Sequence, residues 1–376
     1  MTPLTLPLYT NFNLKKWSML MQLSDLGWNT FFNENFEIFR DQDYTPMRII
    51  RENRKKYLGI NELGEYTCEI SGKFRFNSGS KSNFPAVGDW VGVSVLQNEK
   101  RAMIHTLLPR KSAFSRKVAG KTADEQIVAA NIDVVFIVSG LDFNYNLRRI
   151  ERYISLAWES GAVPVILLNK ADLCNESEIR KSEVESIAFG IDVHTVSALQ
   201  NTGLEILNKY ITSGKTSAFL GSSGVGKSTI INSLLGIKRQ QINEVSELGS
   251  RGRHTTTSRE LFLLPGGGMV IDTPGMKELQ VWGDEEGLEH AFEDIESLAA
   301  NCRFRDCKHE NEPDCAVQKA LNSGTLAQKR FENYLKLKKE FAFISNRVTM
   351  KANAVEKLRW KKISQFAKNL KKDNKI

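Results

Sequence analysis

The chain has 376 residues, of which 41% are hydrophobic and 26% charged, a composition typical of a soluble globular protein with two or three domains. Its apolar runs stay below the 18 residues of a membrane span, and residues 1–10 lack the basic segment and apolar core of a signal peptide. Five cysteines are too few for a disulfide scaffold. We therefore expect a cytoplasmic protein with no membrane partner.

The net charge of +8 is unevenly placed along the chain. Residues 327–376 contain 15 Lys and Arg against 4 Asp and Glu, whereas the rest of the chain has 37 basic and 40 acidic residues. A basic tail on an otherwise slightly acidic protein predicts a polyanionic partner, most simply nucleic acid. A solvated helical face would have the same composition, so the charge alone leaves both interpretations open.

Residues 1–45 are rich in aromatic side chains, and we expect a helical N-terminal extension whose helix at 14–26 ends at Gly27. Short, partly alternating apolar segments follow at residues 47–51, 57–60, 66–70, 91–95 and 102–105. They predict a β-barrel of the oligonucleotide/oligosaccharide-binding (OB) type over residues 46–112, although an SH3-like barrel would look similar. The longest loop of this region carries Lys73, Phe74, Arg75, Phe76 and Lys81. Such a loop either stacks on single-stranded nucleic acid or is merely solvated.

After a basic connector at residues 110–131, predicted strands alternate with predicted helices. Strands are expected at residues 132–138, 163–168, 193–196 and 217–220, and helices at 147–158, 176–189 and 203–210. A predicted hairpin joins residues 261–264 to 269–271. The nearly continuous apolar runs are typical of buried parallel strands, so the pattern predicts a doubly wound α/β domain.

One stretch of this region fits the phosphate-binding loop pattern G-x-x-x-x-G-K-[ST]. It consists of Gly221, Ser222, Ser223, Gly224, Val225, Gly226, Lys227, Ser228 and Thr229. Glycines allow backbone N–H groups to approach a phosphate chain closely, and the following helix N-terminus favours negative charge. Lys227 is expected to reach the β- and γ-phosphates, and the Ser228 hydroxyl to bind Mg²⁺. A Gly/Ser-rich turn that binds nothing is the alternative.

A second motif, N-K-x-D at Asn169, Lys170 and Asp172, follows the strand predicted at 163–168. One carboxylate, Asp172, can accept both the N1–H and the N2 amino group of guanine, and adenine has no such pair of donors. Asn169 is expected to contact the phosphate-binding loop, and the Lys170 stem to cover the base. Ser197 and Ala198 end the next strand and fit the element that offers a backbone N–H to guanine O6.

Two further segments fit the mobile switches of a GTPase. In the run Arg251-Gly252-Arg253-His254-Thr255-Thr256-Thr257, one threonine hydroxyl is expected to close on Mg²⁺ and the γ-phosphate, with Thr256 the first choice and Thr255 the second. Downstream, Asp272 fits the aspartate that reaches Mg²⁺ through water, and the N–H of Gly275 fits the γ-phosphate sensor.

Two features depart from an ordinary Ras-like GTPase. The base-recognition motif precedes the phosphate-binding loop, an order that a circular permutation produces while the site stays intact. The residue after Asp-Thr-Pro-Gly is Met276, where Ras-like enzymes have the glutamine that orients water. His254 is the candidate catalytic replacement, and a loop histidine that contacts only solvent or a partner is the alternative.

A metal-ligand pattern follows at Cys302, Cys307, His309 and Cys315. Three thiolates and one imidazole fill a tetrahedral site with no open position, which predicts one structural Zn²⁺. Free cytosolic thiols are the alternative.

The permuted motif order, the run from Gly252 to Thr257 and the Cys/His pattern resemble the bacterial RsgA (YjeQ) family over about residues 45–330. Members of this family are circularly permuted GTPases that depend on the small ribosomal subunit. The resemblance implies a circularly permuted P-loop GTPase domain at 113–283, after the OB barrel and before a helical zinc-binding domain with a basic tail at 284–376.

The resemblance also implies a function. We expect a monomeric hydrolase that binds GTP, GDP and Mg²⁺, contacts 16S-type rRNA near the decoding region and acts late in 30S subunit assembly. Hydrolysis would be stimulated by the subunit, with His254 as the suspected catalytic group. The alternative is an RNA-binding module that GTP regulates and whose turnover is incidental. A P-loop ATPase is disfavoured by Asp172.

Overall fold

The computed structural model describes residues 21–53, 56–117, 125–236, 259–272, 288–289, 291–310 and 312–339. The chain divides into two compact units, one of Met1–Arg116 with Asp124–Gln280 and the other of Lys117–Ala123 with Val281–Ile376. In the described segments no helix has both the length and the apolar character to cross a membrane.

The N-terminal part of the first unit is a β-barrel. Its strands are β1 (Thr45–Asn53), β2 (Lys56–Asn61), β3 (Gly64–Ile70), β4 (Trp90–Leu96) and β5 (Arg101–Leu107). They pair in the order β1-β2-β3-β5-β4, and β4 pairs back onto β1, which closes the barrel. Alternating side chains fill its interior, among them Met47, Tyr66 and Ile104. This strand order, with the short helix α3 (Gly72–Asn77) after β3, agrees with the predicted OB type.

A short N-terminal segment packs against the barrel. It comprises the 3₁₀ turn η1 (Leu23–Leu26), the helix α2 (Thr30–Phe36) and the 3₁₀ turn η2 (Glu37–Gln42). Gly27 ends η1 in the left-handed conformation, at φ 89°, as the sequence predicted for the end of its first helix. The ring of Trp28 lies 4.8 Å from the fully buried ring of Trp90 in β4, so the aromatic residues of the segment serve as packing surface.

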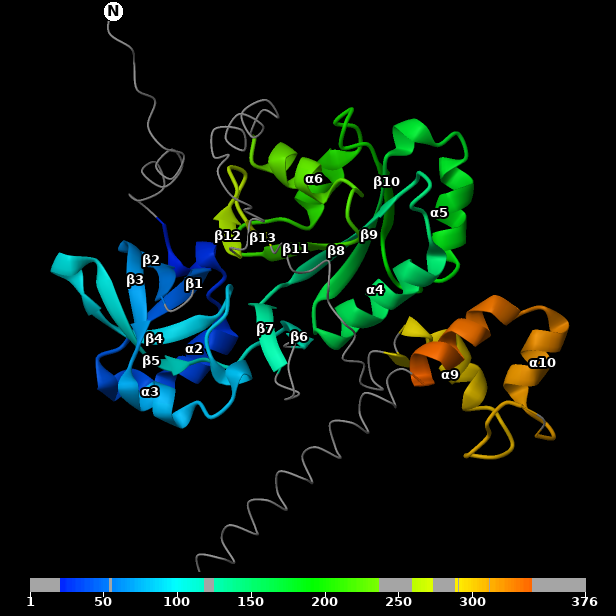
Figure 1. Ribbon diagram of the computed structural model, residues 1–376, viewed down its shortest axis with the longest axis horizontal. Coiled ribbons are helices and arrows are strands. Elements are labelled where there is room, and N and C mark those ends of the chain that lie inside the picture. The colour runs from blue at the N-terminus through cyan, green and yellow to red at the C-terminus, as the bar shows by residue number, and fades with distance from the viewer. Residues whose placement is uncertain are drawn as a thin grey trace, which may run out of the picture. The chain divides into compact units, whose positions relative to one another are not determined.

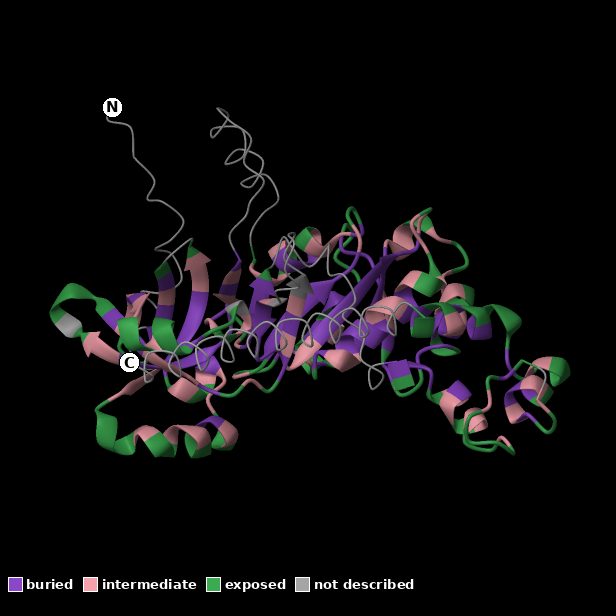
Figure 2. Cartoon of the chain, turned by 60° about the horizontal axis from the view of Figure 1, so that its bottom comes forward, coloured by how far each residue is buried: buried purple, intermediate pink, exposed green. Residues whose placement is uncertain are grey.

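The α/β part of the first unit contains the predicted parallel strands. They are β8 (Val134–Gly140), β9 (Val163–Asn169), β10 (Val193–Val196), β11 (Thr216–Leu220) and β13 (Met269–Asp272), with β12 (Glu260–Leu263) antiparallel to β13. The order is β10-β9-β8-β11-β13-β12, which differs from the chain order because the connections cross over (Figure 1). The connecting elements are α4 (Leu147–Glu159), η5 (Ala171–Leu173), α5 (Ser177–Glu185), η6 (Leu204–Lys209) and α6 (Lys227–Leu234). Figure 2 shows that buried residues follow these strands, as expected for a sheet covered on both faces.

The two parts of this unit share one sheet, because β1 of the barrel pairs antiparallel with β12. Arg48 of β1 is buried at the same junction. Its guanidinium donates to the carbonyl of Leu26 in the N-terminal segment. It also donates to the hydroxyl of Thr216 at 2.8 Å and to the carbonyls of Gly88 and Asn131 at 3.3 and 3.2 Å. The N-terminal segment, the barrel and the strand that precedes the phosphate-binding loop are thus held together by one buried side chain.

Several local expectations differ from the structure. The predicted loop around Lys73 and Phe76 is the helix α3, which begins because the Ser71 hydroxyl accepts from the N–H of Phe74 and caps the first turn. The predicted connector at 110–131 contains two paired strands, β6 (Ala113–Lys117) and β7 (Glu125–Ala130). Its many basic residues obscured the alternation of apolar and polar side chains that is typical of strands. Residues 14–20 of the predicted first helix lie outside the described residues, and of its described part only Leu23–Leu26 is helical, as the 3₁₀ turn η1.

In the second unit the described residues are mainly helical. The helices are α9 (Glu293–Ala299), α10 (Ala316–Ser323) and a helix over residues 328–339. Arg330 donates two hydrogen bonds of 2.7 Å to the carboxylate of Asp294, and Phe292 and Tyr334 pack at 5.5 Å. These contacts hold the last described helix against α9. The greater part of the basic tail, residues 340–376, lies outside the described residues.

Candidate functional site

The phosphate-binding loop lies where β11 ends and α6 begins. β11 is buried along its whole length, and Lys227 is the first residue of α6. The Lys227 ammonium donates to the carbonyls of Gly221 and Ser222 at 2.6 and 2.7 Å, so it lies across the mouth of the loop. Ser223, Gly224 and Ser228 are exposed there, Ser222, Gly226 and Thr229 are half-buried, and Val225 points its side chain into the core.

Asn169 connects this loop to the base-recognition motif. It ends β9 and is 2% exposed. Its amide nitrogen donates to the carbonyl of Val225 at 2.7 Å, and its amide oxygen accepts from the N–H of Ala198 at 2.9 Å. A β-carbon on Gly226 would lie 2.2 Å from that amide nitrogen, and Gly226 has φ 101°. Only glycine fits here, because the loop passes directly over the Asn169 side chain.

Asp172 and Ser197 face each other from the ends of neighbouring strands. The Ser197 hydroxyl donates to the carboxylate of Asp172 at 2.5 Å. This bond orients the carboxylate that was predicted to read guanine. The N–H of Ala198, which the prediction assigned to guanine O6, donates to Asn169 in this structure.

Lys170 is oriented by a residue that the sequence analysis missed. It adopts a left-handed conformation at φ 67°, and its ammonium forms an ion pair with the carboxylate of Asp142 at 2.6 Å. Burial by itself raises the pKa of Asp142, but the hydrogen bond and the charge of Lys170 outweigh this effect and hold the pKa below its ordinary value. Asp142 follows the end of β8, the strand between β9 and β11, and this position at a strand end was the signal available in the sequence.

Arg149 and Asn144 also reach the phosphate-binding loop and were not predicted. The Arg149 guanidinium donates to the hydroxyl of Ser222 at 3.1 Å and to the side-chain oxygen of Asn144 at 2.5 Å. The Asn144 amide nitrogen in turn donates to the carbonyl of Ser223 at 3.4 Å. The residues just before α4, which include Asn144, and α4 itself, which includes Arg149, therefore support the phosphate-binding loop from outside the predicted motif.

Asp272, the predicted aspartate on the Mg²⁺ side, ends β13 and is exposed. Because β13 is the parallel neighbour of β11, Asp272 lies on the same edge of the sheet as the phosphate-binding loop. His254, Thr255, Thr256 and Gly275 lie outside the described residues.

The second unit contains the predicted Cys/His cluster. The ligand atoms of Cys302, Cys307, His309 and Cys315 all lie within 4.8 Å of one another. The sulfurs of Cys302 and Cys315 are 3.8 Å apart, and the His309 Nδ1 lies 3.6 and 3.4 Å from them. Two sulfurs bound to one tetrahedral zinc are about 3.8 Å apart, so this cluster fits a metal such as zinc. The Gln318 amide donates to the backbone carbonyl of His309 and fixes that loop.

A phosphate-binding loop beside a guanine-type motif, at strand ends that the chain visits in permuted order, defines a circularly permuted P-loop GTPase fold. Comparison with known proteins agrees. The model of the RsgA GTPase family matches residues 107–282. The chain is 43% identical over 362 residues to the small ribosomal subunit biogenesis GTPase RsgA of Syntrophotalea carbinolica, covering 94% of this chain and 99% of that protein. It is 44% identical to the protein of the same name from Opitutus terrae, covering 92% and 96%.

Two solved structures of similar proteins match the fold of this chain as well. The crystal structure of YjeQ from Thermotoga maritima matches with a TM-score of 0.61 and 29% identity, covering 80% of this chain and 99% of that one. YloQ, described as a circularly permuted GTPase, matches with a TM-score of 0.58 and 26% identity, covering 80% and 95%. The chain belongs to the RsgA GTPase family. The predicted family and the predicted fold class are thereby confirmed.

Proposed function

We propose that this protein hydrolyses GTP to GDP and phosphate, that the small ribosomal subunit stimulates the reaction, and that the protein acts late in 30S subunit assembly. Its relatives are named small ribosomal subunit biogenesis GTPases. The observation that carries the nucleotide assignment is the bond between Ser197 and Asp172. Asp172 lies three residues after Asn169, which holds the phosphate-binding loop. An oriented carboxylate at this place suits the paired donors of guanine.

The proposed residue roles are those expected of the predicted GTPase motifs. Backbone N–H groups of residues 221–226 bind the phosphates, and Lys227 leaves its contacts with Gly221 and Ser222 to neutralise them. Ser228 and Thr256 would hold Mg²⁺ through their hydroxyls, and Asp272 would reach it through water. The ion would supply positive charge that neutralises the phosphates. Asp142 keeps Lys170 extended along the site. His254 orients the attacking water, because Met276 cannot.

The remaining parts of the proposal concern partners and domains. The Cys/His cluster of the second unit holds one structural Zn²⁺, and the protein is a cytoplasmic monomer. The barrel at residues 46–112 and the basic tail contact rRNA. The proposed boundaries are 1–45 for the N-terminal extension, 113–283 for the GTPase domain and 284–376 for the zinc-binding domain.

The decisive experiment measures phosphate release from GTP and from ATP, with and without purified small ribosomal subunits. We expect slow turnover of GTP alone, a rise by orders of magnitude with subunits, and no reaction with ATP. His254→Ala is expected to abolish the stimulated turnover while binding of fluorescent GDP is retained. Turnover that subunits leave unchanged would refute the ribosomal assignment, and stimulated turnover by the His254 variant would refute its catalytic role.

A further inference from the structure

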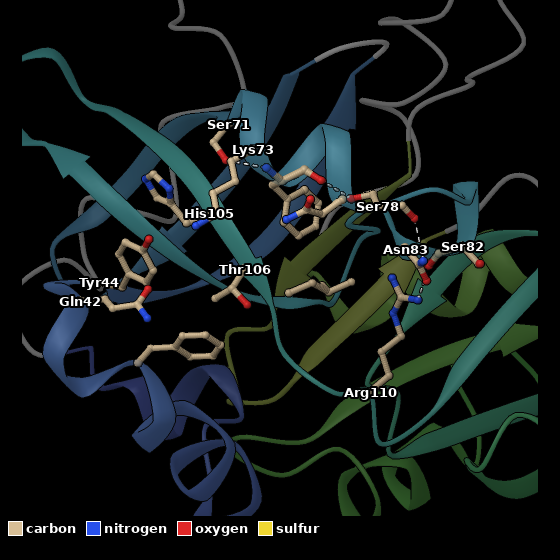
Figure 3. Close-up of a pocket in the computed structure, with 14 residues that line it drawn as sticks. Gln42, Tyr44, Ser71, Lys73, Ser78, Ser82, Asn83, His105, Thr106 and Arg110 are labelled. Carbon is tan, nitrogen blue, oxygen red and sulfur yellow. Dashed lines mark hydrogen bonds between the residues drawn. The ribbon is translucent and has the colours of Figure 1, made fainter. Parts of the chain in front are cut away.

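A cavity of about 520 Å³ opens on the barrel, away from the nucleotide site. It lies between the end of the N-terminal segment, the helix α3 and the strand β5 (Figure 3). Its volume falls in the range of about 300–1,000 Å³ that is usual for small-ligand pockets. Nothing in the predicted GTPase motifs accounts for it, and no function has been assigned above to the segment that forms one of its walls.

One wall of this pocket is aromatic. The rings of Tyr44 and His105 stack at 4.7 Å with an interplanar angle of 9°, and Phe39 lies 6.4 Å from Tyr44. The hydroxyl of Ser94 is 2.9 Å from the Nε2 of His105 and fixes the imidazole from behind. A flat aromatic surface therefore exists before any ligand binds. A base that stacks on it loses little binding free energy to the ordering of side chains.

The charge of the pocket is positive. Arg110 and Lys73 are among its described lining residues, which include no aspartate or glutamate. Arg110 is already neutralised, because it forms two hydrogen bonds of 2.8 and 2.7 Å to the buried carboxylate of Asp89. None of the ion pairs between described residues involves Lys73. Burial, together with the charge of Lys73, lowers the pKa of His105, so the imidazole is neutral at pH 7 and Lys73 supplies the uncompensated charge.

Side-chain amides complete the lining. Asn77, Asn83 and Gln42 border the cavity, and Asn83 is held by its bond to the carbonyl of Ser78 at 2.7 Å. Amides offer donors and acceptors to the Watson–Crick edge of a base. Aromatic rings, amides and one cation without a partner acid match the three parts of a nucleotide, which are the base face, the base edge and the phosphate.

We propose that this pocket binds one unpaired nucleotide of a single-stranded RNA segment. The base packs against the Tyr44 and His105 wall, and the phosphate pairs with Lys73. The N-terminal segment then acts as part of an RNA site, because its Phe39 and Gln42, together with Tyr44 just after it, line the pocket. This proposal rests on the proposed function in one respect only, namely that the RNA partner is ribosomal.

The test measures the binding of a fluorescent ten-nucleotide single-stranded RNA to the full-length protein by anisotropy. The same sequence as a duplex and free nucleoside monophosphates serve as further probes. Tyr44→Leu removes the ring and keeps apolar bulk, and it is expected to weaken single-strand binding about tenfold. Lys73→Gln is expected to weaken it several-fold and to reduce the slope of log K against log salt by about 0.7.

Lys56→Gln is the matched control, because Lys56 lies on the barrel outside the pocket and pairs with Glu69 at 3.1 Å. It is expected to change single-strand binding by less than about twofold, since it leaves the pocket intact. Unstimulated GTP turnover is expected to be the same in all three variants, because none of them touches the nucleotide site.

Three outcomes would overturn the proposal: equal effects of Lys73→Gln and Lys56→Gln, duplex binding as tight as single-strand binding, or monophosphates that bind as tightly as the oligonucleotide. The last would assign the pocket to a free nucleotide. Stimulation of the unaltered protein by small ribosomal subunits is measured in parallel. Stimulation without pocket-dependent RNA binding would refute this inference alone, and pocket-dependent binding without stimulation would refute only the proposed function.

Discussion

Arg51 of barrel strand β1 lies directly opposite Glu260 of β12, and their side chains form an ion pair across the junction. Arg259, the residue before Glu260, pairs with Glu52 of β1 at 3.3 Å. Residues 251–257, which carry the predicted switch threonine, end two positions before Arg259. The barrel is therefore attached to the strand that directly follows the predicted first switch.

This attachment predicts a measurable coupling. Arg51→Glu is expected to lower the free energy of unfolding by about 1 kcal/mol, because it places like charges opposite each other on a partly exposed pair of strands. The double variant Arg51→Glu/Glu260→Arg is expected to recover most of that loss in urea denaturation. Lys181→Glu, at the more exposed pair with Glu185 on α5, is the control and should cost less. Failure of the double variant to recover stability would show that the pair contributes nothing.

Base recognition predicts a change of nucleotide specificity. Asp172→Asn keeps the size of the side chain and its bond to Ser197, but it replaces an acceptor by a donor. We expect GTP affinity to fall at least about 100-fold and the affinity for xanthosine triphosphate to rise, because the 2-oxo group of xanthine accepts from an amide. Competition against fluorescent GDP measures both. Asp192→Asn alters an exposed carboxylate that pairs with Lys209 and accepts from the hydroxyl of Tyr210, and it is expected to leave the specificity unchanged.

The contact between Gly226 and Asn169 predicts a steric defect. Gly226→Ala would place a β-carbon 2.2 Å from the Asn169 amide nitrogen at a φ of 101°. We expect GTP binding to weaken by two orders of magnitude or more, because the loop must move away from the base-recognition motif. Gly190→Ala is a matched control, with φ 68° and no heavy atom within 4 Å of the added carbon. Isothermal titration measures the GTP affinity of both variants, and equal losses would argue against a defect specific to Gly226.

The Cys/His cluster predicts a metal stoichiometry. The purified protein is expected to contain one zinc per chain by elemental analysis, and Cys315→Ser is expected to lose most of it because the tetrahedral set is broken. Limited proteolysis of that variant should cut preferentially within the second unit. Cys174→Ser alters a half-buried thiol of the first unit, away from the cluster, and should retain both metal and resistance. Full zinc occupancy in Cys315→Ser would exclude this cluster as the site.

Much of the candidate site could be predicted from the sequence because its residues fall in short, continuous motifs. The motif at Asn169–Asp172 lies at one strand end and the turn after it, and the motif at Gly221–Thr229 joins a strand end to the first residues of α6. Residue spacing, together with the predicted strands and helix beside it, therefore indicated their roles. Asp142, Asn144 and Arg149 were missed because they approach the other motifs only after β8 is placed between β9 and β11. The helix α3 was taken for a loop because its capping residue, Ser71, precedes only six helical residues.

By itself, the sequence determined the class of the protein, its permuted order of motifs and the four residues of its candidate metal site, because each depends on residue types at short, fixed spacings. Tertiary structure alone decided which strand ends become neighbours, that the barrel and the α/β sheet share hydrogen bonds through β1 and β12, and that Tyr44 stacks on His105 beside Lys73. These contacts join residues far apart in the chain. These contacts depend on strand register and on burial, and short sequence motifs determine neither.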